Sequence, residues 1–375
     1  MARVSRSPNE LQERSFMKIT DIELGHLSIP LKTPFKTALR TVTHVEDVLV
    51  RVLTDTSHVG YGAAPPTAAI TGETRESIET AIEQHIKKQI IGQSIENLET
   101  TMQRLHQSVS KNTSARAAVD MALYDLWGQL YETPVYKLLG GYRKEIVTDI
   151  TISVNEPEEM ARDSLDAVKG GFRTLKIKVG KEPEKDITRL ERIRETIGHD
   201  INLRLDANQG WTPREAVYIL NSIKDAGIEI ELVEQPVKGH DLEGLKFVTD
   251  HVSVPVVADE SVFSTQDALK IIRMHAADMM NIKLMKTGGI YNALKICALA
   301  ESVGMECMIG CMLESKISVT AAAHLAGAKG IFTKIDLDPP LLCREDPIKG
   351  GALFSGEKII LSDEPGLGFQ LSSLF

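Results

Sequence analysis

"RTLKIKVG", residues 173–180, is the stretch that decides the fold, because it places two lysines in a segment that otherwise looks buried. Side chains of an extended strand alternate between two faces, so three apolar residues lie on one face and Lys176 and Lys178 on the other. A glycine-rich helix end, "AVKGGF", precedes the segment and a helix-like segment follows it, which is typical of a buried parallel strand. The two lysines are therefore either the protection of an exposed strand edge or functional groups.

Short apolar segments of this kind alternate with helical segments from about residue 147 onward. The helical segments begin with Thr, Ser or an acidic residue, and several end in Gly, as helix caps require. Eight βα repeats with right-handed crossovers close into a (β/α)8 barrel, so we expect an α/β fold with a TIM barrel over residues 131–345. The eight predicted strands are 147–154, 173–180, 202–210, 230–237, 254–261, 280–289, 306–315 and 331–340.

The chain before the barrel has a different pattern, with strands first and helices after them. We expect an α+β capping domain over residues 17–130, a polar and disordered arm over 1–16, and a C-terminal segment, 346–375, that returns to the capping domain. Within the capping domain the predicted strands are 18–31, 45–55 and 59–66, the predicted loop is 32–44, and the predicted helices are 73–89, 95–109 and 112–130.

Composition narrows the class of function. The net charge is −9, which argues against nucleic acid as the main partner. Four cysteines are too few for a disulfide framework, and "CMIGC" at 307–311 is interpreted as buried thiols because no second pair follows at zinc-site spacing. No apolar run is long enough for a membrane span, and the polar start does not resemble a secretory signal, so we expect a cytoplasmic enzyme with a small-molecule substrate.

Three acidic residues end three consecutive predicted strands: Asp206, Glu234 and Asp259. In barrels of this type the active site lies at the carboxyl ends of the strands, so these side chains converge on one mouth. Any one of them alone is more often a structural ion pair or a helix cap. Three together would repel one another without a cation, and their hard oxygen ligands suit Mg²⁺. Asn208 follows Asp206 by two residues, and Glu260 directly follows Asp259. Both are expected to contact the ligand residues and not the metal itself.

Lys178 and Lys283 come from strands two and six, on opposite sides of the barrel. A substrate held between them would meet one lysine on each face, as a two-base proton transfer requires. Burial and nearby cations should lower the pKa of such a base. The alternative for Lys283 is a surface lysine. Lys286 is its competitor, but its place beside the "TGG" turn indicates the helix layer.

Asp336 and Asp338 share a face at period two in "KIDLDPP" and could together accept hydrogen bonds from an ammonium group. The alternative, an aspartate that starts a turn before Pro339, explains Asp338 well and Asp336 poorly. Arg40, in the predicted loop of the capping domain, is the natural partner for a second substrate carboxylate, although an isolated loop arginine is more often an ordinary surface residue.

The motifs "TLKIKVG", "LRLDANQGW", "ELVEQPV", "VADES" and "NIKLMKTGG", in this order, resemble the muconate-lactonizing-enzyme subgroup of the enolase superfamily over nearly the whole chain from Met17. Within the subgroup, "DLDPPL", "PFKTALRTV" and "APPTAAITGET" are similar to the dipeptide epimerases that act on Ala-Glu. A lysine base working with Mg²⁺ is established chemistry of that superfamily.

The resemblance implies roles for individual residues. It makes Asp206, Glu234 and Asp259 the Mg²⁺ ligands and Lys178 and Lys283 the two bases. It also implies that Lys176 contacts the substrate carboxylate, that Asp336 and Asp338 hold the dipeptide ammonium, that Arg40 pairs with the glutamate side chain, and that Thr151 lines the site. A mobile loop is implied at residues 31–44.

The leading hypothesis is thus a Mg²⁺-dependent 1,1-proton transfer that epimerises the C-terminal residue of a dipeptide. One alternative is another enzyme of the superfamily: a cycloisomerase, an o-succinylbenzoate synthase or an N-acylamino-acid racemase, whose substrates lack the ammonium group. The other alternative is a non-catalytic barrel that serves as a binding or regulatory subunit, which would be expected to have lost a base or a ligand. A homo-oligomer is possible by analogy with the fold.

Overall fold

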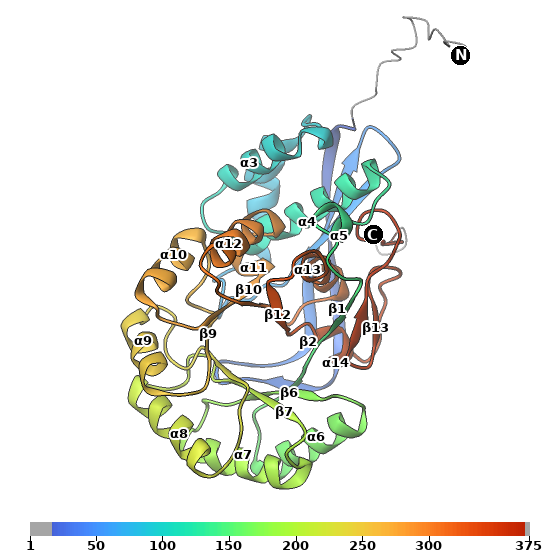
Figure 1. The fold of residues 1–375 in the computed structure, drawn as a ribbon. Helices are drawn as coiled ribbons and strands as arrows, with labels where there is room; N and C mark the ends of the chain where they lie inside the picture. The colour runs from blue at the N-terminus through green and yellow to red at the C-terminus, as the bar shows by residue number, and fades with distance from the viewer. Residues whose placement is uncertain (1–16, 372–375) are drawn as a thin grey trace, which may run out of the picture.

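The computed structural model describes residues 17–371, so the expected arm at 1–16 lies outside the described residues. The chain forms a three-stranded antiparallel sheet with helices against it, and a larger unit of parallel strands ringed by helices (Figure 1). The α/β class, the barrel-like domain and the α+β capping domain are therefore confirmed.

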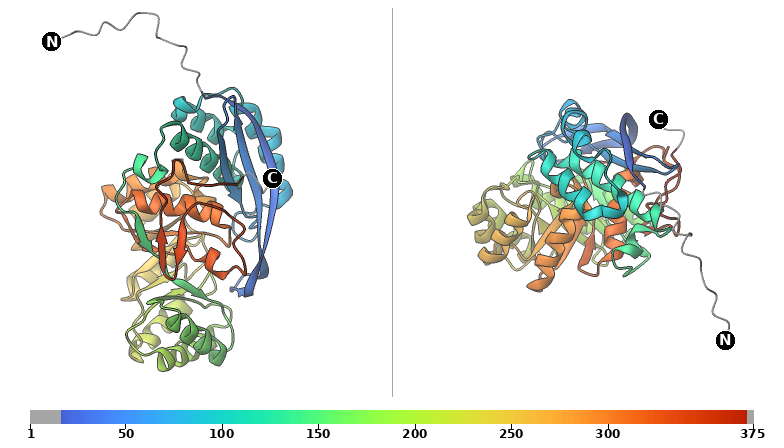
Figure 2. Two further views of the ribbon diagram at one scale, coloured as in Figure 1. Left: turned by 90° about the vertical axis from the view of Figure 1, so that its right-hand side faces the viewer. Right: turned by 90° about the horizontal axis from the view of Figure 1, so that it is seen from above.

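The first sheet has the order β1-β2-β3 and runs along one side of the molecule (Figure 2). Helix α4 packs directly on β3, because Gly62 and Gly60 leave no side chain between them: a Cβ on Gly62 would lie 1.9 Å from the carbonyl oxygen of Ala118. The elements of this part are β1 (Ile19–Lys36), β2 (Thr41–Thr54), β3 (Val59–Ala64), α1 (Arg75–Thr80), the π-helix η1 (Ala81–Ile86), α2 (Lys87–Ile90), the 3₁₀ helix η2 (Ile95–Asn97), α3 (Leu98–Ser108), α4 (Thr113–Leu130) and α5 (Val135–Leu138).

The predicted loop at 32–44 is wrong over most of its length. Strand β1 continues to Lys36 and β2 begins at Thr41, so only a four-residue turn, 37–40, separates them. Phe35 pairs with Val42, beyond an irregularity in the register that follows Pro30. Pro34 favours a loop here, but pairing with the partner strand extends the hairpin.

Eight parallel strands form the second sheet in sequence order, from β5 to β12. The strands of this unit are β5 (Ile150–Ile152), β6 (Thr174–Lys178), β7 (Asn202–Asp206), β8 (Leu232–Glu234), β9 (Val256–Ala258), β10 (Met279–Lys283), β11 (Cys307–Gly310) and β12 (Phe332–Ile335). The helices between and after them are α6 (Pro157–Lys169), α7 (Pro183–Ile197), α8 (Pro213–Asp225), α9 (Leu242–His251), α10 (Thr265–Met274), α11 (Leu284–Thr287), α12 (Ile290–Ser302), α13 (Lys316–Ala328) and α14 (Pro339–Leu342).

The expected complete closure of the barrel is wrong in one respect. Within the described residues, β5 and β12 are the two ends of the sheet and do not pair with each other as strands. The seam between them is crossed by a hydrogen bond from the Asp149 N–H to the Ile335 carbonyl (3.3 Å) and one from the Leu337 N–H to Thr148 Oγ1 (2.8 Å). Strand β6 lies inside the sheet, next to β5, so its lysines do not protect an exposed edge.

The last part of the chain forms a small sheet and then contacts the first helices. Strands β13 (Leu353–Ser355) and β14 (Lys358–Ile360) form a hairpin that pairs with β4 (Glu145–Val147). Further on, the Leu367 N–H donates to Asp125 Oδ1 in α4 at 2.7 Å.

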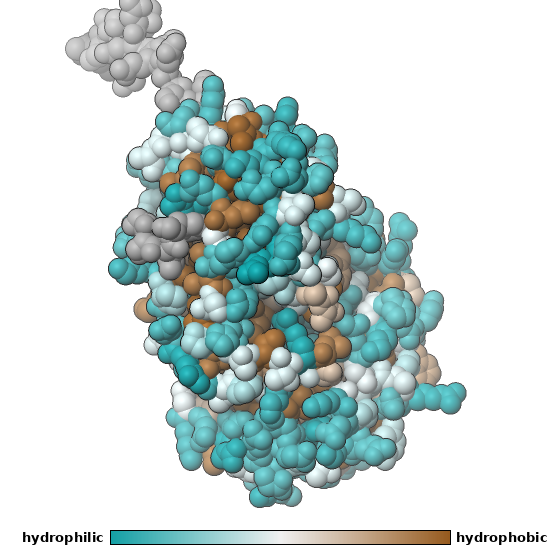
Figure 3. Space-filling view, turned by 180° about the vertical axis from the view of Figure 1, so that it is seen from behind, coloured by the Kyte–Doolittle hydropathy of each residue, from teal (hydrophilic) through white to brown (hydrophobic). Residues whose placement is uncertain are grey.

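Hydrophilic and hydrophobic residues share the surface of the face in Figure 3. On the face opposite that of Figure 1, the lower end is mostly hydrophilic, and hydrophobic residues elsewhere are interspersed with hydrophilic ones (Figure 3). No helix of residues 17–371 is both long and apolar enough to cross a bilayer.

Candidate active site

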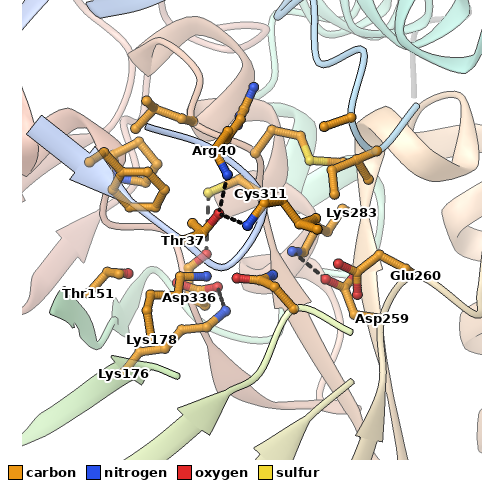
Figure 4. Close-up of a pocket in the computed structure, with 18 of the residues that line it drawn as sticks. Thr37, Arg40, Thr151, Lys176, Lys178, Asp259, Glu260, Lys283, Cys311 and Asp336 are labelled. Carbon is orange, nitrogen blue, oxygen red and sulfur yellow. Dashed lines mark hydrogen bonds and ion pairs between the residues drawn. The ribbon is translucent and has the colours of Figure 1, made fainter. Parts of the chain in front are cut away.

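Lysines and carboxylates meet at the carboxyl ends of the barrel strands (Figure 4). Register explains the first contacts, because Lys178 stands beside Asp206 and Asp206 beside Glu234 on neighbouring strands. Lys178 Nζ lies 2.6 Å from Asp206 Oδ2. Lys176 Nζ, one step deeper on the same face, lies 2.6 Å from Glu234 Oε2. Because side chains alternate along a strand, Lys176 and Lys178 of β6 lie on the same face and both point into the barrel.

A second lysine contact lies across the mouth, on β9 and β10. Lys283 Nζ is 2.7 Å from Asp259 Oδ2 and 3.6 Å from Glu234 Oε1. Lys178 and Lys283 therefore approach the same group of carboxylates from β6 and from β10, as the sequence predicted. Both side chains are buried and line one pocket.

Three carboxylates at the mouth, Asp206, Glu234 and Asp259, have lowered pKa values, which favours their ionised form. Burial and the neighbouring Glu234 work against the charge of Asp206, but three lysines outweigh both, so the pKa of Asp206 lies below its usual range. The pKa of Asp259 is also lowered, because Lys283 and Lys286 outweigh its burial. In the described part of the chain these carboxylates point toward lysines. No group of three or more Asp, Glu, His or Cys side chains there has the geometry of a preformed metal site.

The expected lowering of a base pKa counted Mg²⁺ among the nearby cations, whereas the protein groups alone raise the pKa of Lys283. Burial lowers it, but the carboxylates of Asp259 and Glu234 outweigh burial and hold it well above the usual range. The pKa of Lys176 is raised for the same reason. The expectation counted burial and the neighbouring cations but not the number of carboxylates within reach.

Asp336 and Asp338 lie at the seam, next to the lysine network. Asp336 Oδ2 accepts a hydrogen bond from Lys176 Nζ at 2.6 Å. Asp338 Oδ2 accepts the N–H of Thr151 at 2.7 Å, and burial together with Asp336 raises the pKa of Asp338 to about 6. Asp338 stands at the start of α14, before Pro339, but its side chain makes no capping bond there. The turn-forming interpretation therefore does not account for its side chain.

Arg40 lies in the hairpin turn above the pocket, across from Lys176 and Lys178 (Figure 4). Thr37 Oγ1 fixes the turn by accepting the N–H groups of Leu39 (3.1 Å) and Arg40 (3.3 Å). The guanidinium forms no ion pair with any residue in 17–371, and burial lowers its pKa. A cation without a partner at the rim of a pocket is suited to an anionic group of a ligand.

The two supporting residues differ in their contacts. The Asn208 N–H donates to Asp206 Oδ1 at 2.9 Å, while Asn208 Oδ1 is buried and has no partner among residues 17–371. Neither carboxyl oxygen of Glu260 has a hydrogen-bond partner within the described chain, and burial and Asp259 raise the pKa of Glu260 to about 8.

Two family models match the chain: "Mandelate racemase / muconate lactonizing enzyme, N-terminal domain" over residues 20–140 and "Enolase C-terminal domain-like" over residues 159–373. The chain belongs to the mandelate racemase/muconate lactonizing enzyme family of the enolase superfamily. Three features of the structure agree with this membership: the capping domain, the eight parallel strands, and the ion pairs of acidic and basic side chains at the strand ends.

Individual relatives are similar over almost their whole length. The L-Ala-D/L-Glu epimerase of Clostridium acetobutylicum is 61% identical over 94% of this chain and 99% of its own. The structure of a substrate-liganded complex of the L-Ala-D/L-Glu epimerase from Bacillus subtilis superposes with a TM-score of 0.93 at 50% identity, over 94% of this chain and 99% of that one. The dipeptide epimerase of Enterococcus faecalis, solved with Mg and the dipeptide L-Leu-L-Tyr, has a TM-score of 0.91 at 45% identity, over 94% and 100%.

In this member of the family, Lys286 does not lie in the helix layer, and that expectation is wrong. Its side chain is fully buried, with Nζ 2.5 Å from Asp259 Oδ1 and hydrogen-bonded to the Asn281 carbonyl at 3.0 Å. The short helix α11 begins directly after Lys283 and turns Lys286 back toward the mouth. Because α11 was not predicted, the position of Lys286 beside the "TGG" turn gave the wrong direction.

Sequence reasoning also missed two amides that organise the carboxylates. Asn281 Nδ2 donates to Glu234 Oε1 at 2.7 Å, and Gln235 Oε1 accepts the N–H of Asp259 at 2.8 Å. Asn281 could have been found, because it lies two residues before Lys283 and shares its face. Gln235 has a positive φ of 37°, which no sequence pattern indicated.

Proposed function

We propose that this chain is a Mg²⁺-dependent dipeptide epimerase that inverts the α-carbon of the C-terminal residue, with Ala-Glu dipeptides as substrates. The observation that carries the proposal is the approach of Lys178 and Lys283 to one group of carboxylates from β6 and from β10. The named activities of the similar proteins from Clostridium acetobutylicum and Bacillus subtilis support the substrate class.

Mg²⁺ fits the residues of the site. Asp206, Glu234 and Asp259 provide hard oxygen donors on adjacent strands, and for all three the neighbouring lysines lower the pKa. We assign these three residues as the ligands, with Asn208 and Glu260 as their supports. When bound, Mg²⁺ would supply positive charge that stabilises the negative charge developing on the substrate carboxylate.

The lysines move the proton. Lys178 and Lys283 are assigned as the two bases, one removing the α-proton and the other returning a proton to the opposite face of the same carbon. The contacts of Lys283 with Asp259 and Glu234 raise its pKa and so hold its proton. To act as a base, Lys283 must lose some of these contacts. Lys176 is assigned to the substrate carboxylate.

The remaining residues bind the two ends of the dipeptide. Asp336 and Asp338 are assigned to its ammonium group, and we call this pair the ammonium clamp. Thr151 positions Asp338 through its N–H. Arg40 is assigned to the side-chain carboxylate of glutamate, since its guanidinium is at the pocket rim and forms no ion pair with residues 17–371.

The test is incubation with L-Ala-L-Glu in D₂O with Mg²⁺, followed by NMR of the glutamate α-proton. Deuterium at that carbon together with L-Ala-D-Glu supports the proposal. The other enzymes of the superfamily remain the alternative, and exchange with an N-acyl glutamate but not with the dipeptide would favour them. Binding of Mg²⁺ and dipeptide without any exchange would indicate a non-catalytic protein.

We also propose a cytoplasmic location, division of the chain at residues 130 and 345, and assembly into a homo-oligomer. The four cysteines, all buried and free, support a reducing compartment. Limited proteolysis with mass spectrometry tests the boundaries, and light scattering tests the assembly.

A further inference from the structure

Arg204 is a buried arginine beneath the mouth that no role above employs. It lies on β7, two residues before Asp206, and is 7% exposed. Its Nη1 donates to Asp149 Oδ2 at 2.8 Å and to the Ile335 carbonyl at 2.9 Å, and its Nε donates to Glu231 Oε2 at 2.6 Å. One side chain thus joins β7 to residues at the ends of three other strands, β5, β8 and β12.

Two of these acceptors stand on opposite sides of the seam. Asp149 directly precedes β5, and Ile335 is the last residue of β12. These strands do not pair as the other neighbours of the sheet do. The backbone hydrogen bond across the seam joins Asp149 to Ile335, and Arg204 donates a hydrogen bond to each of these residues. Its guanidinium therefore links β5 and β12 where they do not pair as strands.

The ammonium clamp is built on this seam. Asp336 directly follows Ile335, and Asp338 is bonded to the N–H of Thr151, on the β5 side. The Asp336 N–H is bonded to the Ile309 carbonyl of β11, so a change in the separation of β5 and β12 would alter the distance between the two carboxylates of the clamp. The other carboxylates of the mouth come from strands inside the sheet, where continuous ladders hold them.

The charge of Arg204 is already compensated, so it is not a binding site itself. Asp149 and Glu231 face it, and Glu231 also accepts Lys334 Nζ at 2.6 Å. A guanidinium has donors in a fixed planar fork and can serve three acceptors at once, whereas a lysine cannot reproduce that geometry.

We propose that Arg204 is a positioning residue that fixes the β5–β12 seam and thereby the spacing of the ammonium clamp. The inference rests on the proposed function, because the clamp is assigned there. It predicts that loss of Arg204 weakens recognition of the substrate ammonium and leaves recognition of the rest of the molecule intact.

The experiment compares two ligands that differ only in that ammonium, L-Ala-L-Glu as substrate and N-propionyl-L-glutamate as competitive inhibitor. In Arg204→Met the KM for the dipeptide should rise about tenfold, as expected when a charge-assisted hydrogen bond is misaligned, with the inhibition constant of the propionyl compound unchanged. Arg204→Lys should not restore the KM.

Arg194→Met is the matched control, because Arg194 is similarly buried and its donors within residues 17–371 go only to the carbonyls of Gly198, Ile201 and Glu229, away from the clamp. It should lower the melting temperature without changing the ratio of the two constants. A parallel rise of both constants in Arg204→Met, or the same change of ratio in Arg194→Met, would overturn the inference.

Hydrogen–deuterium exchange separates this inference from the proposed function. If the wild-type chain epimerises no dipeptide, the proposed function fails, but the seam is still tested. Faster exchange at the amides of Asp149 and Leu337, which donate across the seam, in Arg204→Met and Arg204→Lys than in Arg194→Met supports the role of Arg204. Equal exchange in the three variants contradicts it.

Discussion

Two groups of buried carboxylates in this protein have opposite protonation behaviour. At the barrel mouth, Asp206 and Asp259 have lowered pKa values. Where strand β2 meets the loop after β11, burial raises the pKa of Asp47 to about 6 and that of Glu314 to about 8. All four side chains are almost completely removed from solvent.

The difference lies in the cations, not in the burial. Lysines lie within ion-pair distance of both mouth carboxylates. Asp47 and Glu314 form no ion pair with residues 17–371 and receive backbone N–H groups instead, from Ser315 and Met312. Burial disfavours charge in both places, but only at Asp206 and Asp259 do lysines within ion-pair distance outweigh it. The mouth is thus suited to a cation, and the second group to a neutral structural contact.

The largest expected effect comes from removing the divalent cation. Treatment with EDTA should abolish α-proton exchange, and Mg²⁺ should restore it, because the substrate carboxylate would lose its counter-charge. Mg²⁺ should also raise the melting temperature of the wild-type chain. This shift should vanish in Asp206→Asn and persist in Glu314→Gln, and a shift that persists in both would show that the cation binds elsewhere.

Next in size is the loss of one lysine of the mouth. Lys178→Ala and Lys283→Ala should each lower epimerisation in both directions by about 10²–10⁴-fold, the usual contribution of a general base. Each variant should still exchange the α-proton of the one epimer that faces the remaining lysine. NMR in D₂O, starting from L-Ala-L-Glu and from L-Ala-D-Glu, measures this.

Lys295→Ala on α12 is the control for that experiment, because Lys295 lies over the Tyr291 ring, away from the mouth. Epimerisation that is lost in only one direction would contradict the two-base assignment.

A smaller effect is expected at the ammonium clamp. Asp336→Asn should raise the KM for L-Ala-L-Glu about tenfold, because the ammonium loses an anionic acceptor and keeps only a neutral amide oxygen. Steady-state kinetics with the dipeptide and with an N-acyl glutamate distinguish the outcomes. Activity indifferent to this change would favour a substrate without an ammonium group.

The smallest effect concerns the pH dependence of stability at Glu314. Its pKa is about 8 in the fold against an ordinary 4.5, so the folded chain binds the proton more tightly. Glu314 therefore contributes a loss of stability as the pH rises from about 4.5 to about 8, with no further change above that range. Glu314→Gln should remove that slope from melting temperatures measured across this window. Asp47→Asn should act only between about pH 4 and 6, since the folded pKa of Asp47 is about 6. An unchanged slope in Glu314→Gln would show that Glu314 is already ionised in the fold.

Much of the fold could be predicted because local patterns repeat. Eight apolar segments with helix caps between them indicate parallel strands wherever they pack, and the period of two placed Lys176 and Lys178 on one face before any contact was known. The open seam could not be predicted, because it depends on whether the first and last strands approach closely enough to pair.

The sequence by itself determined which charged residues end which strands, since strand period and repeat order are local properties of the chain. Only the tertiary structure decided that Lys286 turns back onto Asp259, that Thr41 and Val42 extend the hairpin over the pocket, and that Arg204 reaches the seam. The contacts of Arg204 join residues that are distant in sequence, and the contact of Lys286 depends on helix α11, which was not predicted. The state of each buried carboxylate followed from them too, because a pKa depends on which charges lie within a few ångströms.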